Sequence, residues 1–100
     1  EMALTGEAID AAQALALGLV SRVVEPAQLL PEALALAQRI AANPPQVLRW
    51  TKQLLQQART GTLDEALDAA AQLQGLAHHT ADHHEAVAAF FEKRPPVFRG

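Results

Sequence analysis

The sequence has no cysteine, few aromatic residues and no long apolar run, and each absence excludes a class of protein. Without cysteine there are no disulfides and no thiol chemistry, which fits a reducing compartment, so we expect a cytoplasmic protein. No apolar run approaches the roughly 20 residues that a membrane-spanning helix needs, so we expect no membrane partner. Lysine and arginine form no stripe and the net charge is −3, which argues against nucleic acid as a partner.

The residues that are abundant favour helices. Half of the 100 residues are hydrophobic, whereas aromatic residues make up 4%, so alanine and leucine supply most of the apolar surface. Both are strong helix formers. Alanine buries little area per residue, so a core of this kind is thin and would be stabilised by further partner surface. The composition therefore predicts a mainly helical chain.

Caps, glycines and prolines divide this chain into short helices. Three residue pairs have the spacing of a capping box, in which the first side chain accepts from a free helix N–H and the second reaches back. These pairs are Asp10 with Gln13, Thr62 with Glu65, and Asp82 with Glu85. With the apolar periodicity, they predict helices over about residues 11–17, 30–42, 45–59, 62–78 and 82–94.

One segment has the composition of a strand. Residues 19–24, Leu-Val-Ser-Arg-Val-Val, are rich in β-branched side chains and follow Gly18, which is placed to end the preceding helix. A single strand cannot satisfy its backbone hydrogen bonds alone, and no second strand is visible. We therefore expect the partner sheet to lie outside this sequence. The abrupt start at Glu1, with no cap or turn signal, leads to the same expectation of a cut from a longer chain.

The order of these segments resembles the enoyl-CoA hydratase/isomerase family, also called the crotonase family. Two blocks, one at each end, carry most of the resemblance, and a proline-containing turn and a helix lie between them. The matching residues are Leu4-Thr5-Gly6-Glu7, Ile9 to Ala14, Gly18-Leu19-Val20, Asn43-Pro44-Pro45, Thr51-Lys52, Leu54-Leu55, Asp82, Glu85-Ala86-Val87, Ala89-Phe90, Glu92-Lys93-Arg94, Pro96 and Phe98.

The resemblance implies a fold. Members of the family have an N-terminal spiral of ββα units, followed by a C-terminal helical region that makes trimer contacts. Residues 1–24 would then be the end of the spiral core, a short helix with a strand. Residues 25–100 would be the helical region for trimerisation and CoA contact. The expected fold class is mainly α, with four to five short helices and one short strand.

The resemblance also implies a chemistry. The family acts on acyl-CoA thioesters, with the thioester as substrate and no further cofactor. Two backbone N–H groups form an oxyanion hole, and in hydratases a pair of glutamates handles the water and the proton. All these groups belong to the spiral, so no catalytic residue is expected here and this segment alone is predicted to be inactive. Its expected role is in a homo-oligomer, a trimer or a dimer of trimers.

One family function falls within these residues. In related hydratases, an aromatic and a lysine on the last helix help to bind the adenosine end of CoA held by an adjacent subunit. The motif places them at Phe90 and Lys93, a spacing that puts both on one helix face. The ring would cover adenine, and the ammonium would face a phosphate. The adjacent Phe91 leaves open which ring faces the ligand, and core or interface packing remains the alternative for both rings.

Two other interpretations compete with these. The four histidines His78, His79, His83 and His84 suggest a metal site, but a cap separates the two pairs and neither cysteine nor the helical zinc motif is present. We therefore expect no metal and interpret them as solvated residues at helix ends. As an alternative to an enzyme segment, the capped helices are also consistent with a self-standing helical interaction module without catalysis.

Overall fold

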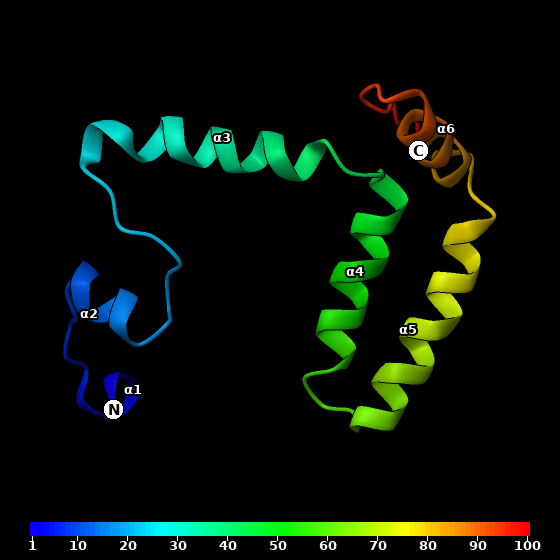
Figure 1. Cartoon of the computed structure of the whole chain (residues 1–100). Helices are drawn as coiled ribbons and strands as arrows, with labels where there is room; N and C mark the ends of the chain where they lie inside the picture. Colours follow the sequence, from blue (N-terminus) through cyan, green and yellow to red (C-terminus); the bar gives the residue numbers. More distant parts are fainter. The chain divides into compact units, whose positions relative to one another are not determined.

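The computed structural model describes all 100 residues, and its regular structure is entirely helical. The chain divides into two compact units, residues 1–35 and 36–100, and each is described by itself. None of the helices combines the length and the apolar character that crossing a bilayer requires. The helices are α1 (Met2–Thr5), α2 (Ala11–Ala16), α3 (Leu29–Ala41), α4 (Pro45–Gln57), α5 (Leu63–His78) and α6 (Ala81–Glu92), with a 3-10 turn over Pro26–Gln28 (Figure 1).

The first unit confirms the predicted cap of α2. The Asp10 carboxylate accepts from the Gln13 N–H at 2.8 Å, and the Gln13 side chain accepts from the Asp10 N–H at 2.9 Å. Gly18 has a φ of 73°, a left-handed conformation that glycine adopts without steric cost, and it ends the helical segment as predicted. The short helix α1 was not predicted, because residues 2–5 carry neither an N-cap side chain nor a periodic stripe.

The predicted strand over residues 19–24 is wrong, because this segment is an irregular connection in the structure. Its β-branched residues favour extended backbone, but a strand forms only when a neighbour satisfies its N–H and C=O groups. No other segment of the chain is extended as a strand, so the segment has no partner to pair with. The mainly helical class is confirmed, without the strand.

The boundary between the two units falls within α3, which begins one residue before its predicted start. Proline at residue 31 lies in the first turn, where its missing N–H costs no helical hydrogen bond. The helix ends at Ala41, and just beyond it the side-chain amide of Asn43 donates to the carbonyls of Arg39 and Ile40 at 3.0 and 3.1 Å. Carbonyls of the last helical turn have no intrahelical N–H to accept, and the Ile40 carbonyl also accepts from the Asn43 backbone N–H at 3.0 Å.

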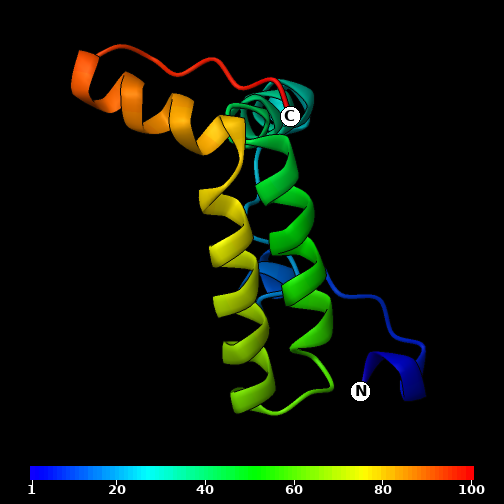
Figure 2. The same ribbon diagram turned by 90° about the vertical axis from the view of Figure 1, so that its right-hand side faces the viewer.

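Helices α4 and α5 form an antiparallel hairpin, which Figures 1 and 2 both show as two neighbouring helices joined by the loop over residues 58–62. The predicted apolar faces of the two helices supply the half-buried residues of this hairpin. They are Val47, Leu48 and Leu54 on α4, and Ala66, Ala70, Leu73 and Ala77 on α5. Small alanines on α5 allow the helices to approach closely, but they leave a thin seam.

The hairpin depends on the cap that starts α5. Thr62 Oγ accepts from the Glu65 N–H at 3.3 Å, and Glu65 Oε2 accepts from the Thr62 N–H at 2.8 Å, which confirms the predicted box. These hydrogen bonds from Thr62, backbone first, lower the pKa of Glu65. We expect Thr62→Ala to reduce the free energy of unfolding of the protein by about 1 kcal/mol, measured by urea denaturation. Thr60→Ala, in the same loop, is the control and should change it by less than about 0.5 kcal/mol.

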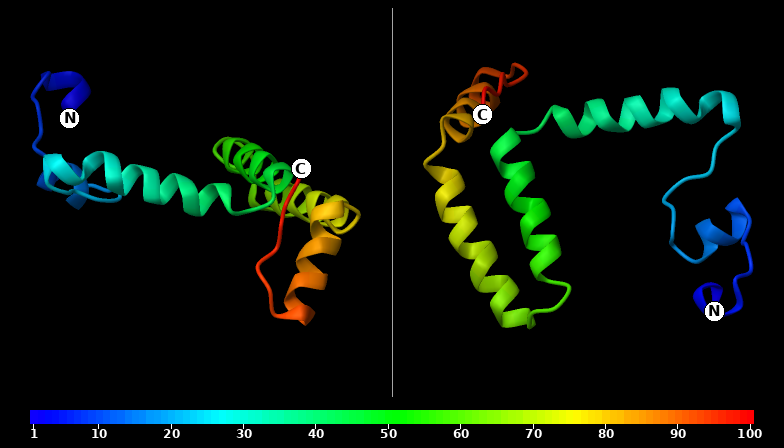
Figure 3. Two further views of the ribbon diagram at one scale, coloured as in Figure 1. Left: turned by 90° about the horizontal axis from the view of Figure 1, so that it is seen from above. Right: turned by 180° about the vertical axis from the view of Figure 1, so that it is seen from behind.

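Helix α6 packs against α5 and begins differently from the prediction. The Asp82–Glu85 capping box is wrong: the N-cap is Thr80, whose Oγ accepts from the His83 N–H at 3.1 Å and donates to the Ala77 carbonyl at 2.7 Å. Thr80 both ends α5 and starts α6, so it takes the capping role. The two acidic side chains are thereby free to bind the C-terminal tail. Figure 3 shows that tail returning along α6.

The chain as a whole buries little. Ala89 on α6 is the one buried hydrophobic residue, at 1% exposure, and Asp82 at 5% is the one buried polar residue. Large apolar side chains lie exposed on several helices, among them Leu30 and Leu34 on α3 and Leu67 on α5. Exposed apolar surface of this extent is typical of a segment whose faces are covered by other polypeptide.

Candidate functional site

The end of α6 presents two aromatic side chains to solvent. Phe90 is 78% exposed and Phe91 is 76% exposed, so neither ring belongs to the core of this chain. Their centroids lie 5.7 Å apart and their planes meet at 76°, an edge-to-face arrangement. Such a pair offers a flat apolar surface next to an aromatic edge, which suits a planar ring as ligand or an aromatic-rich interface.

Lys93 follows directly, in an unusual backbone conformation. Its φ of 54° and ψ of 39° place it in the left-handed region, and it is the one residue other than glycine with a positive φ. The Lys93 N–H donates to the Phe90 carbonyl at 3.3 Å, and the Arg94 N–H donates to the Ala89 carbonyl at 3.1 Å. These two bonds form a Schellman motif, which usually has glycine at this position. The helix therefore ends at Glu92, slightly before its predicted end near Arg94.

A tail clasp holds the residues beyond the helix. We use this name for Asp82, Glu85 and Arg94 together with the backbone N–H groups of the tail that the two carboxylates bind. The Arg94 guanidinium donates to both oxygens of Glu85, at 2.6 and 2.9 Å, and to Glu92 at 2.5 Å. The Val97 N–H donates to Glu85 at 2.8 Å. Two parallel bonds between arginine and a carboxylate fix direction as well as distance.

Asp82 anchors the end of the same tail. Its carboxylate accepts from the Arg99 N–H at 2.9 Å and from the Gly100 N–H at 3.2 Å. A pocket of about 330 Å³ lies under the tail, lined by Asp82, Glu85, Arg94, Val97, Arg99 and Ala81. Asp82 and Glu85 thus bind one strap of backbone from a single face of α6. The sequence motif signalled them, but as a cap, because their spacing fits both roles.

The clasp has a defined pH dependence. Hydrogen bonds from Arg94 and then from the Val97 N–H lower the pKa of Glu85 from 4.5 to about 2. Since the folded pKa lies below the ordinary value, the stabilisation is complete above about pH 4.5 and is lost as the pH falls towards 2. We expect the difference in urea midpoint between the wild type and Glu85→Gln to shrink over this range. A difference that stays constant from pH 6 to pH 2.5 would contradict it.

Charge pairing singles out Lys93 as the available cation near the two rings. Hydrogen bonds to Glu85 and Glu92 raise the pKa of Arg94, whose charge is matched by two carboxylates. The ion pairs of the chain are those of Arg94 with Glu85 and Glu92 and that of Arg22 with Glu32, and Lys93 takes part in none of them. The site thus combines an exposed aromatic pair with an unmatched ammonium one residue beyond the helix. This combination suits a ligand with a planar ring and a negative group.

The histidines gather at the corner between α5 and α6. The rings of His78 and His83 lie 4.7 Å apart, those of His83 and His84 lie 5.9 Å apart, and His78 also contacts the Gln74 side chain at 2.9 Å. No group of three or more histidine, cysteine or acidic side chains has the geometry to hold a metal ion. His78, His79 and His84 are exposed and His83 is half-buried, at the end of α5 and the start of α6.

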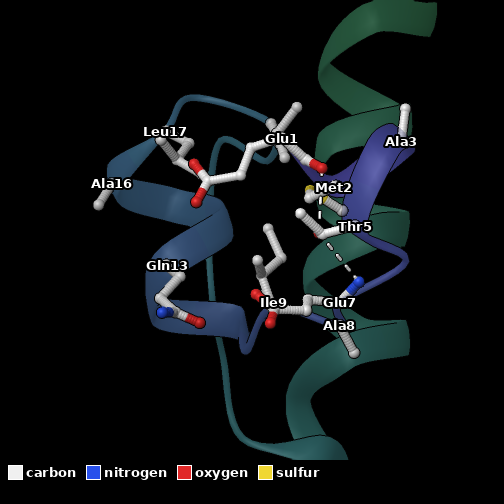
Figure 4. A pocket seen from close by; sticks show the side chains of 11 residues that line it. Glu1, Met2, Ala3, Thr5, Glu7, Ala8, Ile9, Gln13, Ala16 and Leu17 are labelled. Carbon is white, nitrogen blue, oxygen red and sulfur yellow. Dashed lines mark hydrogen bonds between the residues drawn. The ribbon is translucent and has the colours of Figure 1, made fainter.

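A second hollow lies in the first unit and carries no candidate reactive group. It measures about 680 Å³ and is lined by residues of α1, α2 and their connection. Figure 4 shows the Ile9 side chain between the segment with Met2 and Thr5 and the segment with Gln13 and Leu17. Its lining is mainly apolar, which suits the packing of further polypeptide more than the binding of a charged ligand.

The sequence matches one protein family and is similar to proteins named as hydratases or isomerases of CoA thioesters. The profile of the family described as enoyl-CoA hydratase/isomerase matches residues 1–100. The 2,3-dehydroadipyl-CoA hydratase of Escherichia coli is 41% identical over 100 residues, which are all of this chain and 39% of that protein. The 1,2-epoxyphenylacetyl-CoA isomerase of the same species is 39% identical over 99 residues, 99% of this chain and 38% of that protein.

Solved structures agree. An enoyl-CoA hydratase of Mycobacterium smegmatis matches with a TM-score of 0.87 and 33% identity, over 95% of this chain and 37% of that one. An enoyl-CoA hydratase of Polaromonas matches with a TM-score of 0.85 and 34% identity, over 94% and 37%. The chain thus spans about two fifths of the length of the relatives that it matches.

Proposed function

The chain belongs to the enoyl-CoA hydratase/isomerase family, and from that membership we propose that it is the C-terminal part of an enzyme that hydrates or isomerises enoyl-CoA thioesters. The observation that carries the proposal is the match of the family profile to every residue of the chain. The relatives include both hydratases and an isomerase of CoA esters, so the reaction is proposed at the level of this class.

We assign the chemical steps to the three fifths of the relatives that this chain does not span. No residue of the chain is proposed as catalytic, and the segment alone is expected to be inactive. The substrate is a CoA thioester, and no other cofactor is proposed. The cytoplasmic location inferred from composition stays a prediction, which fractionation of the source cells tests.

Within the chain, we propose that Phe90 and Lys93 bind the adenosine end of CoA. Three features of the site support this. The Phe90 ring is exposed, the Lys93 ammonium is matched by no carboxylate, and a backbone hydrogen bond joins the two residues at the helix end. CoA carries a planar adenine next to phosphate groups, so an apolar ring and a cation are the complementary pair.

The remaining surface is proposed to serve assembly. We propose that residues 1–24 close the ββα spiral of the complete protein and that residues 25–100 form the helical region of a trimer or a dimer of trimers. The hollow of the first unit, with its mainly apolar lining, supports the first assignment. The exposed leucines of α3 and α5 support the second, since apolar faces of this extent are usually covered in a working assembly.

The proposal is tested by enzymology on the complete natural protein that contains residues 1–100. It should bind CoA and convert enoyl-CoA thioesters, which is measured by the change in ultraviolet absorbance as the double bond conjugated with the thioester is lost by hydration or moved by isomerisation. A complete protein that neither turns over an enoyl-CoA thioester nor binds CoA would contradict the proposal.

A self-standing helical module is the second candidate, and the complete caps of α2, α5 and α6 are the observation that favours it. Such a module would fold without further polypeptide. The two proposals are distinguished by the natural reading frame and its purified product. A reading frame limited to these residues, whose product folds and has no affinity for CoA, would support the module.

A further inference from the structure

We propose that the Glu85–Arg94 pair of the tail clasp is a positioning device for Lys93, and that it thereby sets affinity for the adenosine end of CoA. This inference rests on the proposed function, because it assumes that Phe90 and Lys93 contact CoA. Glu85 and Arg94 are positioning residues in this account. Neither is proposed to contact the ligand, since the two side chains form an ion pair with each other.

The backbone conformation of Lys93 needs support from neighbouring contacts. A left-handed conformation is unfavourable for a residue with a Cβ atom, and glycine would avoid that cost. Lys93 nevertheless holds this conformation at the end of α6. Such a conformation persists only where surrounding contacts impose it, so the contacts on either side of Lys93 hold its backbone in place.

Both chain neighbours of Lys93 are fixed by hydrogen bonds. On one side, the helix ends at Glu92, and the Lys93 N–H is bonded to the Phe90 carbonyl. On the other side, Arg94 is held through its backbone by the Ala89 carbonyl and through its side chain by both oxygens of Glu85. The position of the Lys93 side chain relative to Phe90 is therefore set by the helix end and by the clasp together.

The tail that follows Arg94 begins with two prolines. Pro95 and Pro96 have no N–H, so neither residue can donate a backbone hydrogen bond to the helix. Val97 offers the first N–H after these prolines, and Glu85 accepts it while also holding Arg94. A single carboxylate thus fixes the chain on both sides of the prolines. Removing that carboxylate frees the tail and the residue that holds Lys93.

The test uses two thioesters on the complete protein. Enoyl-CoA contains the adenosine end, whereas the corresponding enoyl-pantetheine lacks it and keeps the reactive part. We expect Glu85→Gln and Arg94→Gln to raise KM for enoyl-CoA about fivefold, which corresponds to the loss of one partly exposed ion pair, with kcat unchanged. KM for enoyl-pantetheine should stay the same, since a general loss of structure would raise both.

Two further variants serve as controls. Glu92→Gln removes the other carboxylate that contacts Arg94, but this carboxylate binds no tail N–H, so it should leave KM for enoyl-CoA unchanged. Arg94→Lys keeps the charge and loses the two-pronged geometry, so it should raise KM as Arg94→Gln does while preserving the fold. Lys93→Ala should cost less in the Glu85→Gln background than in the wild type, since both changes remove one contact.

The outcomes separate the two proposals. If Lys93→Ala raises KM for enoyl-CoA while Glu85→Gln leaves it unchanged or lowers it, the CoA contact stands and the positioning role is wrong. A lowered KM would show instead that Glu85 restrains a rival cation at Arg94. If Phe90→Ala and Lys93→Ala both leave KM for enoyl-CoA unchanged, the CoA contact itself fails, and the positioning role fails with it.

Discussion

Replacing Phe90 and Lys93 together by alanine is expected to raise the dissociation constant of CoA about 30-fold in the complete protein. Stacking of a base on an aromatic ring and contact of a lysine with a phosphate together contribute about 2 kcal/mol, which corresponds to this factor. Isothermal calorimetry with CoA measures it directly. The exposure of the Phe90 ring, at 78%, means that the change removes a contact surface without opening a core.

Phe91→Ala is the matched control for this result. The two rings are almost equally exposed and lie in one edge-to-face pair, so they differ in position alone. We expect Phe91→Ala to change the dissociation constant of CoA less than about threefold. This is a smaller effect than the loss of one base–aromatic stacking contact would have. A larger effect from Phe91→Ala than from Phe90→Ala would assign the ligand contact to Phe91 and contradict the assignment made from the motif.

The substitution Ala89→Asp is expected to have the largest effect on the stability of the protein. Ala89 is 1% exposed, and its carbonyl accepts the Arg94 N–H that ends α6. A buried carboxylate without a partner costs roughly 3–5 kcal/mol, comparable with the whole stability of many domains. The free energy of unfolding, measured by urea denaturation of the complete protein, should fall by about this amount.

Ala71→Asp is the corresponding control on α5, at an exposed alanine. It should cost only the lower helix propensity of aspartate, about 0.5–0.7 kcal/mol. An equal loss of unfolding free energy in both variants would mean that Ala89 is not tightly packed. In that case the seam between α4 and α5 would be the main source of stability.

The helices and most of their caps followed from the sequence because their determinants are local. The box of Thr62 with Glu65 and the left-handed Gly18 depend on residues within one turn, so spacing alone predicts them. The strand failed for the opposite reason, since strand formation depends on a partner that no local signal supplies. The role of Asp82 and Glu85 was not predicted because it is tertiary: their partners lie 9 to 18 residues further along the chain.

The candidate site divides in the same way. The motif predicted Phe90 and Lys93 as residues of interest, and the structure adds that one is exposed and the other has a left-handed backbone. The spacing could not predict that backbone, because it depends on the Schellman motif and on the anchoring of Arg94. Arg94 before Pro95 and Pro96 is visible in the sequence. That this arginine binds Glu85 could not be predicted from it, because the contact depends on the path of the tail.

The mass in solution of the 100-residue chain, by light scattering with and without CoA, tests most directly the claim that this segment works within a larger assembly. With Ala89 as its one buried hydrophobic residue, the chain should self-associate to masses above its 10.7 kDa. A monodisperse monomer of 10.7 kDa that unfolds cooperatively and ignores CoA would contradict the account, because a self-sufficient module would then explain these residues better.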